Sequence, residues 1–450
     1  MPVSTPPPPP ATAARVPTAR FAHARQAPLN ALRRLRDGAR RLGPGLITGA
    51  ADDDPSGIAT YSQAGAQFGY SMLWSVVFTL PLMAAIQIVS ARIGYVTGQG
   101  LAANIKSSFS RPVLLAVVGL LLAANTLNIA ADIAAMAEAL RLVLGGSAHV
   151  YALTFGLASL AMQVFLPYRA TVRWLKWLTL ALLAYVAVLF TLHLDWSRVL
   201  ERTLDPHLPL TRDMLLTVVA VLGTTISPYL FFWQASQEVE DRGPVVHGPA
   251  EVRHHLRRIK WDTNIGMAFS NLIAFFVMLT TAATLHQAGV TQIETSAQAA
   301  LALRPLAGDQ AFLLFALGII GTGMLAVPVL AGSAAYAVAE SAGWHGSLDL
   351  QLARGEGRGF YAVIAAATLG GVALCFTPAD PVKELFWSAV INGVVAVPVM
   401  VVMMLLATRA SVMGANVIGK PLRRLGWAAT AVMALAVLAL LAASLTGGGG

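Results

Sequence analysis

Asp52-Asp53-Asp54-Pro55-Ser56-Gly57 is the stretch that decides the fold, because it places three carboxylates inside an otherwise apolar run. A charged side chain costs roughly 2.5–3.5 kcal/mol at the centre of a membrane-spanning helix, so such acids normally face a protein-lined cavity. Pro55 removes a backbone N–H and disfavours helix at the residue before it, and Gly57 relaxes the backbone further. We therefore expect a helix that breaks here and offers carboxylates and unwound carbonyl groups to a cation.

The composition of the 450-residue chain indicates a polytopic helical membrane protein. Hydrophobic residues make up 56% and charged residues 12% of the chain, whereas soluble domains carry about 25% charged residues. The net charge of +9 would fit nucleic-acid binding, but the basic residues are spread through loops between apolar segments, which a membrane explains better. The single cysteine, Cys375, excludes a disulfide framework. The sequence has no zinc-type ligand spacing and no phosphate-binding loop, so we expect no cofactor and no enzyme activity.

Eleven apolar segments are long enough to cross a membrane. We expect them to form one transporter domain over 43–446, between a basic, proline-rich tail at 1–42 and a flexible end at 447–450. The tail lacks a signal peptide, and its composition predicts a disordered cytosolic segment. The expected spans lie near 46–66, 72–97, 113–144, 150–167, 175–194, 214–236, 263–285, 311–339, 359–377, 385–408 and 427–445.

The distribution of lysine and arginine predicts the orientation in the membrane. With the N-terminus in the cytosol, most of the 31 basic residues fall on the cytosolic side. The basic residues left for the outer side are Arg141, Arg198, Arg202, Arg212, Arg304 and Lys383. An odd number of spans then places the C-terminus outside, and we expect the protein in the cytoplasmic membrane.

A second interruption lies in the sixth expected span, at Gly223-Thr224-Thr225-Ile226-Ser227-Pro228. Like the first, it runs from glycine through polar residues to proline and is apolar on both sides. Interrupted helices at corresponding points of two halves indicate an inverted-repeat transporter with its site at the midplane. The repeats would cover about 45–194 and 213–408, with an extra span at 427–445. The alternative is two unrelated proline kinks, which are common in membrane helices.

The polar residues at the two breaks are the candidate cation ligands. They are Asp53, Asp54, Ser56, Gly57, Thr224 and Ser227. In the third span, Asn125, Asn128 and Asp132 share one helical face, and we expect them along the ion path or in a proton relay. Asn392 in the tenth span is a further candidate for the path. For the asparagines, hydrogen bonding between helices is the alternative interpretation.

These motifs resemble the NRAMP family of divalent-metal transporters. The matching residues are Gly43-Pro44-Gly45, the Asp54-Pro55 break, the stretch from Asn128 to Ala134, and the Ser227-Pro228 break. The resemblance covers about 45–445 and implies an all-α, LeuT-type fold of two inverted five-helix repeats, here with an eleventh span. It also implies that helices 1 and 6 are broken at the midplane. In typical members, it implies proton-linked import of manganese or iron.

Several residues depart from the pattern of that family. Ser56 and Gly57 replace the Gly and Asn of the first motif, Ser227 and Tyr229 replace the Met and His of the second, and Ala135 replaces an acid. Oxygen ligands suit magnesium, calcium and manganese, whereas the missing thioether favours softer metals. Magnesium keeps several of its waters, and smaller side chains leave room for them. The sequence thus resembles the NRAMP-related magnesium transporter branch, with magnesium, or manganese and iron, as the expected substrate and proton coupling left open.

The alternative function is transport of an organic substrate, such as an amine or amino acid, by a carrier of the same fold. The carboxylates at the first break argue against an amino acid, whose own carboxylate prefers a bare helix N-terminus. A membrane scaffold or an enzyme is the other alternative, but no nucleophile–base constellation supports an enzyme. The expected partners are therefore a divalent cation and the lipid bilayer, with protons left open and nucleic acid excluded.

Overall fold

The computed structural model describes residues 44–166, 179–206, 211–242, 248–348, 350, 356–378 and 380–446, and every regular element in these ranges is a helix. The expected tail, the expected flexible end and the start of the fifth expected span lie outside the described residues.

Helices of membrane-spanning length account for most of the described chain. Eight helical segments are long and apolar enough to cross a membrane, and one of them, Pro55–Thr97, joins parts of two expected spans. Two shorter apolar helices, Leu180–Leu189 and Arg358–Leu374, correspond to the expected fifth and ninth spans. The predicted all-helical membrane architecture is confirmed.

The first expected helix is divided at the acidic stretch. Helix α2 (Pro44–Asp52) ends at the acids, and helix α3 (Pro55–Phe68) begins at the proline. Proline suits the first position of a helix, because its fixed φ fits and its missing N–H would have no partner there. Asp54 caps α3 by accepting a hydrogen bond from the backbone N–H of Gly57 at 2.7 Å.

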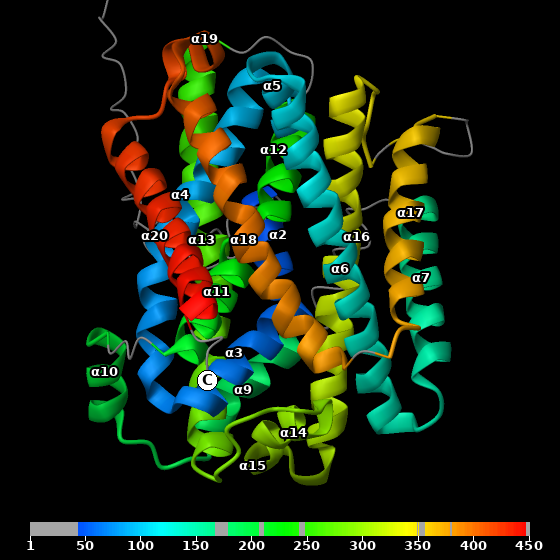
Figure 1. Cartoon of the computed structure of the whole chain (residues 1–450), viewed down its shortest axis with the longest axis vertical. Coiled ribbons are helices and arrows are strands. Elements are labelled where there is room, and N and C mark those ends of the chain that lie inside the picture. The colour runs from blue at the N-terminus through cyan, green and yellow to red at the C-terminus, as the bar shows by residue number, and fades with distance from the viewer. Residues whose placement is uncertain are drawn as a thin grey trace, which may run out of the picture. The chain divides into compact units, whose positions relative to one another are not determined.

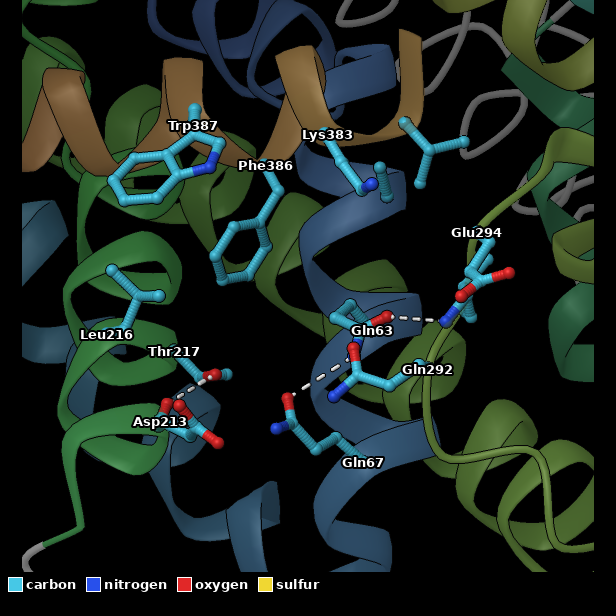
Figure 2. A pocket seen from close by; sticks show the side chains of 13 residues that line it. Gln63, Gln67, Asp213, Leu216, Thr217, Gln292, Glu294, Lys383, Phe386 and Trp387 are labelled. Carbon is cyan, nitrogen blue, oxygen red and sulfur yellow. Dashed lines mark hydrogen bonds between the residues drawn. The ribbon is translucent and has the colours of Figure 1, made fainter. Parts of the chain in front are cut away.

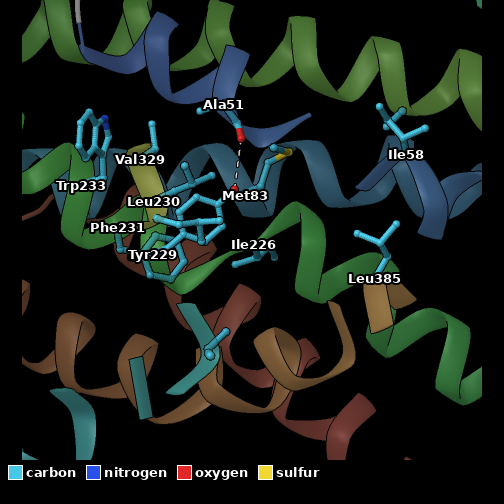
Figure 3. Close-up of a cluster of buried hydrophobic side chains, with 14 of the residues drawn as sticks. Ala51, Ile58, Met83, Ile226, Tyr229, Leu230, Phe231, Trp233, Val329 and Leu385 are labelled. Carbon is cyan, nitrogen blue, oxygen red and sulfur yellow. Dashed lines mark hydrogen bonds between the residues drawn. The ribbon is translucent and has the colours of Figure 1, made fainter. Parts of the chain in front are cut away.

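The sixth expected helix is divided in the same way. Helix α11 (Arg212–Thr225) ends before Ile226, and helix α12 (Pro228–Arg242) begins at the proline. Two side chains from other helices bind carbonyl groups in the first turn of α12. Gln87 donates to the Leu230 carbonyl at 2.9 Å, and Ser333 donates to the Tyr229 carbonyl at 2.9 Å. These bonds fix the position of the second break, and Figure 3 shows Ile226, Tyr229 and Leu230 of this region among buried apolar side chains.

Glycines let both broken helices approach their neighbours at backbone distance. A Cβ atom added at Gly49 of α2 would fall 2.3 Å from the backbone of α13 (Pro249–Thr281). A Cβ atom added at Gly223 of α11 would fall 2.0 Å from the Ala389 carbonyl of α18 (Pro381–Thr408). Close backbone approach through small residues is a common way to pack membrane helices.

The remaining apolar helices complete the bundle. They are α4 (Leu73–Thr97), α6 (Arg111–Leu144), α7 (Ala148–Phe165), α16 (Ala311–Ala342), α17 (Arg358–Leu374) and α20 (Lys420–Thr446). The short helices are α5 (Leu101–Ser108), α9 (Leu183–Leu189), α10 (Trp196–Leu204), α14 (Ser296–Ala300), α15 (Arg304–Ala307) and α19 (Ala410–Met413). Figure 1 shows α5 and α19 at one end of the bundle and α10, α14 and α15 at the other, with the two breaks between them.

Candidate cation site at the helix breaks

Asp54 lies at the centre of the candidate site and is 1% exposed. Its Oδ1 accepts hydrogen bonds from the Gly57 backbone N–H and the Ser56 hydroxyl, both at 2.7 Å. The Tyr229 hydroxyl, from the second break, lies 3.3 Å from Oδ2. A buried carboxylate is costly unless hydrogen bonds or a cation compensate its charge. The donors hold this carboxylate in place, and its remaining lone pairs are free to bind a cation.

Thr224, at the second break, lies next to the first break. A Cβ atom added at Gly57 would lie 3.1 Å from the Thr224 Oγ1, so the two residues face each other across the gap. The Thr224 side chain is buried, and its hydroxyl has no hydrogen-bond partner in the described part of the chain. A buried hydroxyl without a partner is unusual and needs an explanation, such as an ion or a water. The structure thus brings Asp54, Ser56, Gly57 and Thr224 together, as the sequence predicts.

Ser227 is buried in the gap between α11 and α12, and its hydroxyl bonds back to carbonyl groups in the last turn of α11. It donates to the Gly223 carbonyl at 3.0 Å or to the Thr224 carbonyl at 2.7 Å. A hydroxyl keeps its acceptor lone pairs while it donates, so the oxygen can still bind a cation.

The side chain of Asp53 points to a different neighbour from that of Asp54. The Ser270 hydroxyl of α13 lies 3.0 Å from the Asp53 Oδ1 and 2.7 Å from the Asp52 Oδ2. A serine carries one hydroxyl proton and can donate to one of these carboxylates at a time. Asp52 and Asp53 therefore form a separate acidic pair against α13, and Asp53 is not placed with the residues of the second break.

Tyr229 contacts the candidate site and Ser270 contacts the acidic pair beside it, and the sequence singled out neither as a candidate. Tyr229 stood out as a departure from the family pattern, yet its hydroxyl reaches the first break, where it lies 3.2 Å from the Ala51 carbonyl (Figure 3). Its place directly after the Ser227-Pro228 break was the available signal. Ser270 carries no such signal, because a serine inside an apolar helix is common.

The polar face of α6 divides into two kinds of residue. Asn125 donates to the Leu330 carbonyl of α16 at 2.9 Å, which is the bond between helices that the alternative interpretation expects. Asn128 and Asp132 are fully buried, and none of their side-chain polar atoms has a hydrogen-bond partner among the described residues. Asp132 lies within electrostatic range of Asp54 and of the Ser56 backbone. The Asn125 Oδ1, like the polar atoms of Asn128 and Asp132, has no partner among the described residues, so all three residues of this face keep a polar group for an ion path.

Asn392 of α18 is also buried, and neither atom of its amide has a partner in the described ranges. No contact places it against Asp54 or Thr224. Within the same ranges, no group of three or more His, Cys, Asp or Glu side chains is arranged to hold a metal ion. The arrangement at the breaks is instead one carboxylate with hydroxyl groups around it.

Comparison with known proteins identifies relatives along nearly the whole chain. The family model described as natural resistance-associated macrophage protein-like (Nramp) matches residues 45–443. The divalent metal cation transporter MntH of Klebsiella pneumoniae subsp. pneumoniae is 28% identical over 400 residues, covering 87% of this chain and 91% of the relative. The MntH protein of Erwinia tasmaniensis is 31% identical over 299 residues, covering 63% of this chain and 68% of the relative.

Solved structures show the same fold. A variant of the Eremococcus coleocola manganese transporter matches with a TM-score of 0.70 at 20% identity, covering 88% of this chain and 85% of that one. Mhp1, a nucleobase-cation-symport-1 family transporter in a closed conformation with bromovinylhydantoin bound, matches with a TM-score of 0.57 at 13% identity, covering 90% and 93%. The predicted LeuT-type fold, with its first and sixth helices broken, is confirmed.

Proposed function

Because the chain belongs to the Nramp family, we propose that it is a secondary transporter that moves divalent metal cations across the membrane by alternating access. The observation that carries the proposal is the juxtaposition of the Asp54 carboxylate with the free hydroxyl of Thr224 across the two breaks. A carboxylate neutralises part of the charge of the ion, and hydroxyl and carbonyl oxygens complete its shell. The family consists of transporters, so the chain is not assigned an enzyme activity.

Uptake into proteoliposomes tests the proposal directly. A divalent-cation indicator inside the vesicles is expected to respond when magnesium or manganese is added outside, and empty vesicles supply the control. A protein that moves an amine or amino acid and leaves the indicator silent would overturn the assignment in favour of the organic-substrate alternative.

Magnesium is the substrate that the ligand chemistry favours. The groups at the breaks are carboxylate and hydroxyl oxygens, which suit hard cations. Ser227 and Tyr229 stand at the two positions where typical members of the family carry a thioether and an imidazole. Asp132 is the residue that would support coupling to protons.

Ser227→Met is expected to shift the preference from magnesium toward manganese or cadmium, because thioether sulfur favours softer metals and the longer side chain removes space for water. Competition uptake with the three metals measures the shift. Ser227→Leu is the matched control, since it adds similar bulk without sulfur. An equal shift in both variants would assign the effect to volume, and a wild type that already prefers cadmium strongly would refute the magnesium proposal.

Asp132→Asn is expected to lower uptake severalfold, because it removes a buried carboxyl group close to Asp54. The pH dependence of uptake separates two roles. If Asp132 relays protons, the variant's uptake depends on external pH differently from that of the wild type. If Asp132 attracts cations, the variant's uptake rate is lower at every pH, but the shape of its pH profile is that of the wild type. Wild-type rates at every pH would leave the residue with a packing role alone.

The orientation is proposed to be N-terminus in the cytosol and C-terminus outside, in the cytoplasmic membrane. The grouping of the short helices supports this (Figure 1). The end with α5 and α19 carries loops rich in lysine and arginine, whereas the end with α10, α14 and α15 carries few. Ions would therefore enter from the α14 end.

A further inference from the structure

A cavity of about 250 Å³ opens at the α14 end of the bundle, between α3, α11, α18 and the segment that precedes α14 (Figure 2). We call it the entrance cavity and define it by the amide and charged residues of its lining, Gln63, Gln67, Asp213, Gln292, Glu294 and Lys383. These residues are distinct from those of the cation site. The lining reaches Ala59, which lies two residues along α3 from Gly57.

A second, much smaller cavity of about 20 Å³ adjoins the entrance cavity. It shares Ala59 with the entrance cavity and extends to Ile58 of α3 and to Ala135 of α6, three residues from Asp132. Its lining is mostly apolar, and its volume suits about one water molecule. None of the residues of the cation site lines either cavity, so the entrance cavity is separate from that site.

Hydrogen bonds organise the glutamines of the entrance cavity. The Gln63 amide nitrogen lies 3.2 Å from the Gln67 Oε1 and 3.0 Å from the Gln292 Oε1. The Gln63 Oε1 accepts from the Ile293 backbone N–H at 2.9 Å. Each amide oxygen accepts up to two hydrogen bonds, so Gln67 and Gln292 keep acceptor capacity toward the cavity. The result is a set of preorganised neutral acceptors, as Figure 2 shows.

Charged residues face this set from the other sides. Figure 2 shows Asp213 of α11 across the cavity from Gln67 of α3, with Glu294 and Lys383 further along the lining. Asp213 and Glu294 make no ion pair with another described residue, and the Lys383 Nζ lies 3.8 Å from the Asp380 Oδ2 outside this set. The two carboxylates, of Asp213 and Glu294, and the single ammonium of Lys383 give the lining a net negative charge, so the cavity attracts cations.

We propose that the entrance cavity captures the divalent cation with its water shell intact, before the ion loses water at Asp54. Bound waters point their hydrogens outward, so a hydrated ion is recognised by acceptors such as amide and carboxylate oxygens. Six waters occupy about 180 Å³ at their liquid volume, which the cavity accommodates. Lys383 keeps the binding weak, which a transport path requires because the ion must leave again. This inference rests on the proposed function and specifies the form of the substrate.

Hexaamminecobalt(III) is the probe for this site, because its ligands do not exchange and its outward N–H groups mimic those of bound water. It is expected to inhibit magnesium uptake competitively from the entrance side. The double variant Asp213→Asn/Glu294→Gln is expected to raise its inhibition constant, and the KM for magnesium, by on the order of tenfold at low ionic strength. Lys383→Gln is expected to lower both values. The maximal uptake rate and the preference among metals are expected to stay unchanged.

The double variant Glu201→Gln/Asp309→Asn is the matched control, because it removes two exposed acids at the same end of the bundle but outside the cavity. Equal effects in both double variants would overturn the inference in favour of general surface charge. A wild-type KM and inhibition constant in Asp213→Asn/Glu294→Gln would overturn it as well. Inhibition by tetraethylammonium but not by hexaamminecobalt(III) would reassign the cavity to organic cations. In each case wild-type magnesium uptake persists, whereas a protein that moves no divalent cation refutes the proposed function itself.

Discussion

Asp54→Asn is expected to abolish divalent-cation uptake in a protein that still folds. Loss of one partner of a buried charge pair costs roughly 2–5 kcal/mol, so uptake should fall by at least about 30-fold. Asparagine caps a helix as well as aspartate does, so the hydrogen bond to the Gly57 N–H that begins α3 can persist. The substitution therefore separates the charge of Asp54 from its role in shaping the break. Metal-indicator uptake, with thermal unfolding in detergent as the measure of folding, checks both parts.

Asp195→Asn is the matched control, because Asp195 caps α10 in the same way from an exposed position. It should leave uptake unchanged. Asp54→Ala should lose uptake and, in addition, about 1 kcal/mol of stability, because alanine cannot cap α3. If Asp54→Asn transports at the wild-type rate, the carboxylate is not a ligand of the ion. Capping α3 would then be the whole role of Asp54.

The two breaks were predictable from the sequence because local chemistry causes them. Pro55 and Pro228 cannot continue a helix from the preceding residue, and the aspartate and serine before them supply alternative hydrogen bonds. The cost of acids in a membrane then requires the first break to face the protein interior. Those arguments need no knowledge of the rest of the chain, and the structure confirms the break positions they predict.

The direction of each side chain at the breaks was not predictable in the same way. Asp53 and Asp54 are neighbours in sequence, but Asp53 faces Ser270 of α13 and Asp54 faces the second break. This difference depends on how α2 packs on a helix more than two hundred residues away, through the close approach at Gly49. Likewise, the sequence selected Ser227 and Thr224 equally, and they differ because the Ser227 hydroxyl bonds back to α11 whereas the Thr224 hydroxyl has no partner among the described residues.

Thr224→Val is expected to lower uptake by about tenfold while leaving the protein at least as stable as the wild type. The substitution keeps the shape of the side chain and removes the hydroxyl that faces Gly57. A missing oxygen ligand costs roughly 1–3 kcal/mol of interaction with the ion. The folded protein without an ion loses no hydrogen bond, because the Thr224 hydroxyl has no partner in the described part of the chain. Removing a buried hydroxyl without a partner is neutral or stabilising.

Thr225→Val, in the adjacent residue, is expected to have the opposite effects on uptake and on stability. The Thr225 hydroxyl bonds to the Val221 carbonyl and lies 3.3 Å from the Tyr61 hydroxyl, so its loss should cost about 1 kcal/mol of stability and little uptake. Uptake rates and unfolding temperatures of the two variants, measured side by side, test the assignment. A ligand role for Thr224 requires that the more stable variant is the poorer transporter. If uptake instead follows stability in both variants, the hydroxyl at the gap does not bind the ion, and Asp54 must hold it with backbone oxygens.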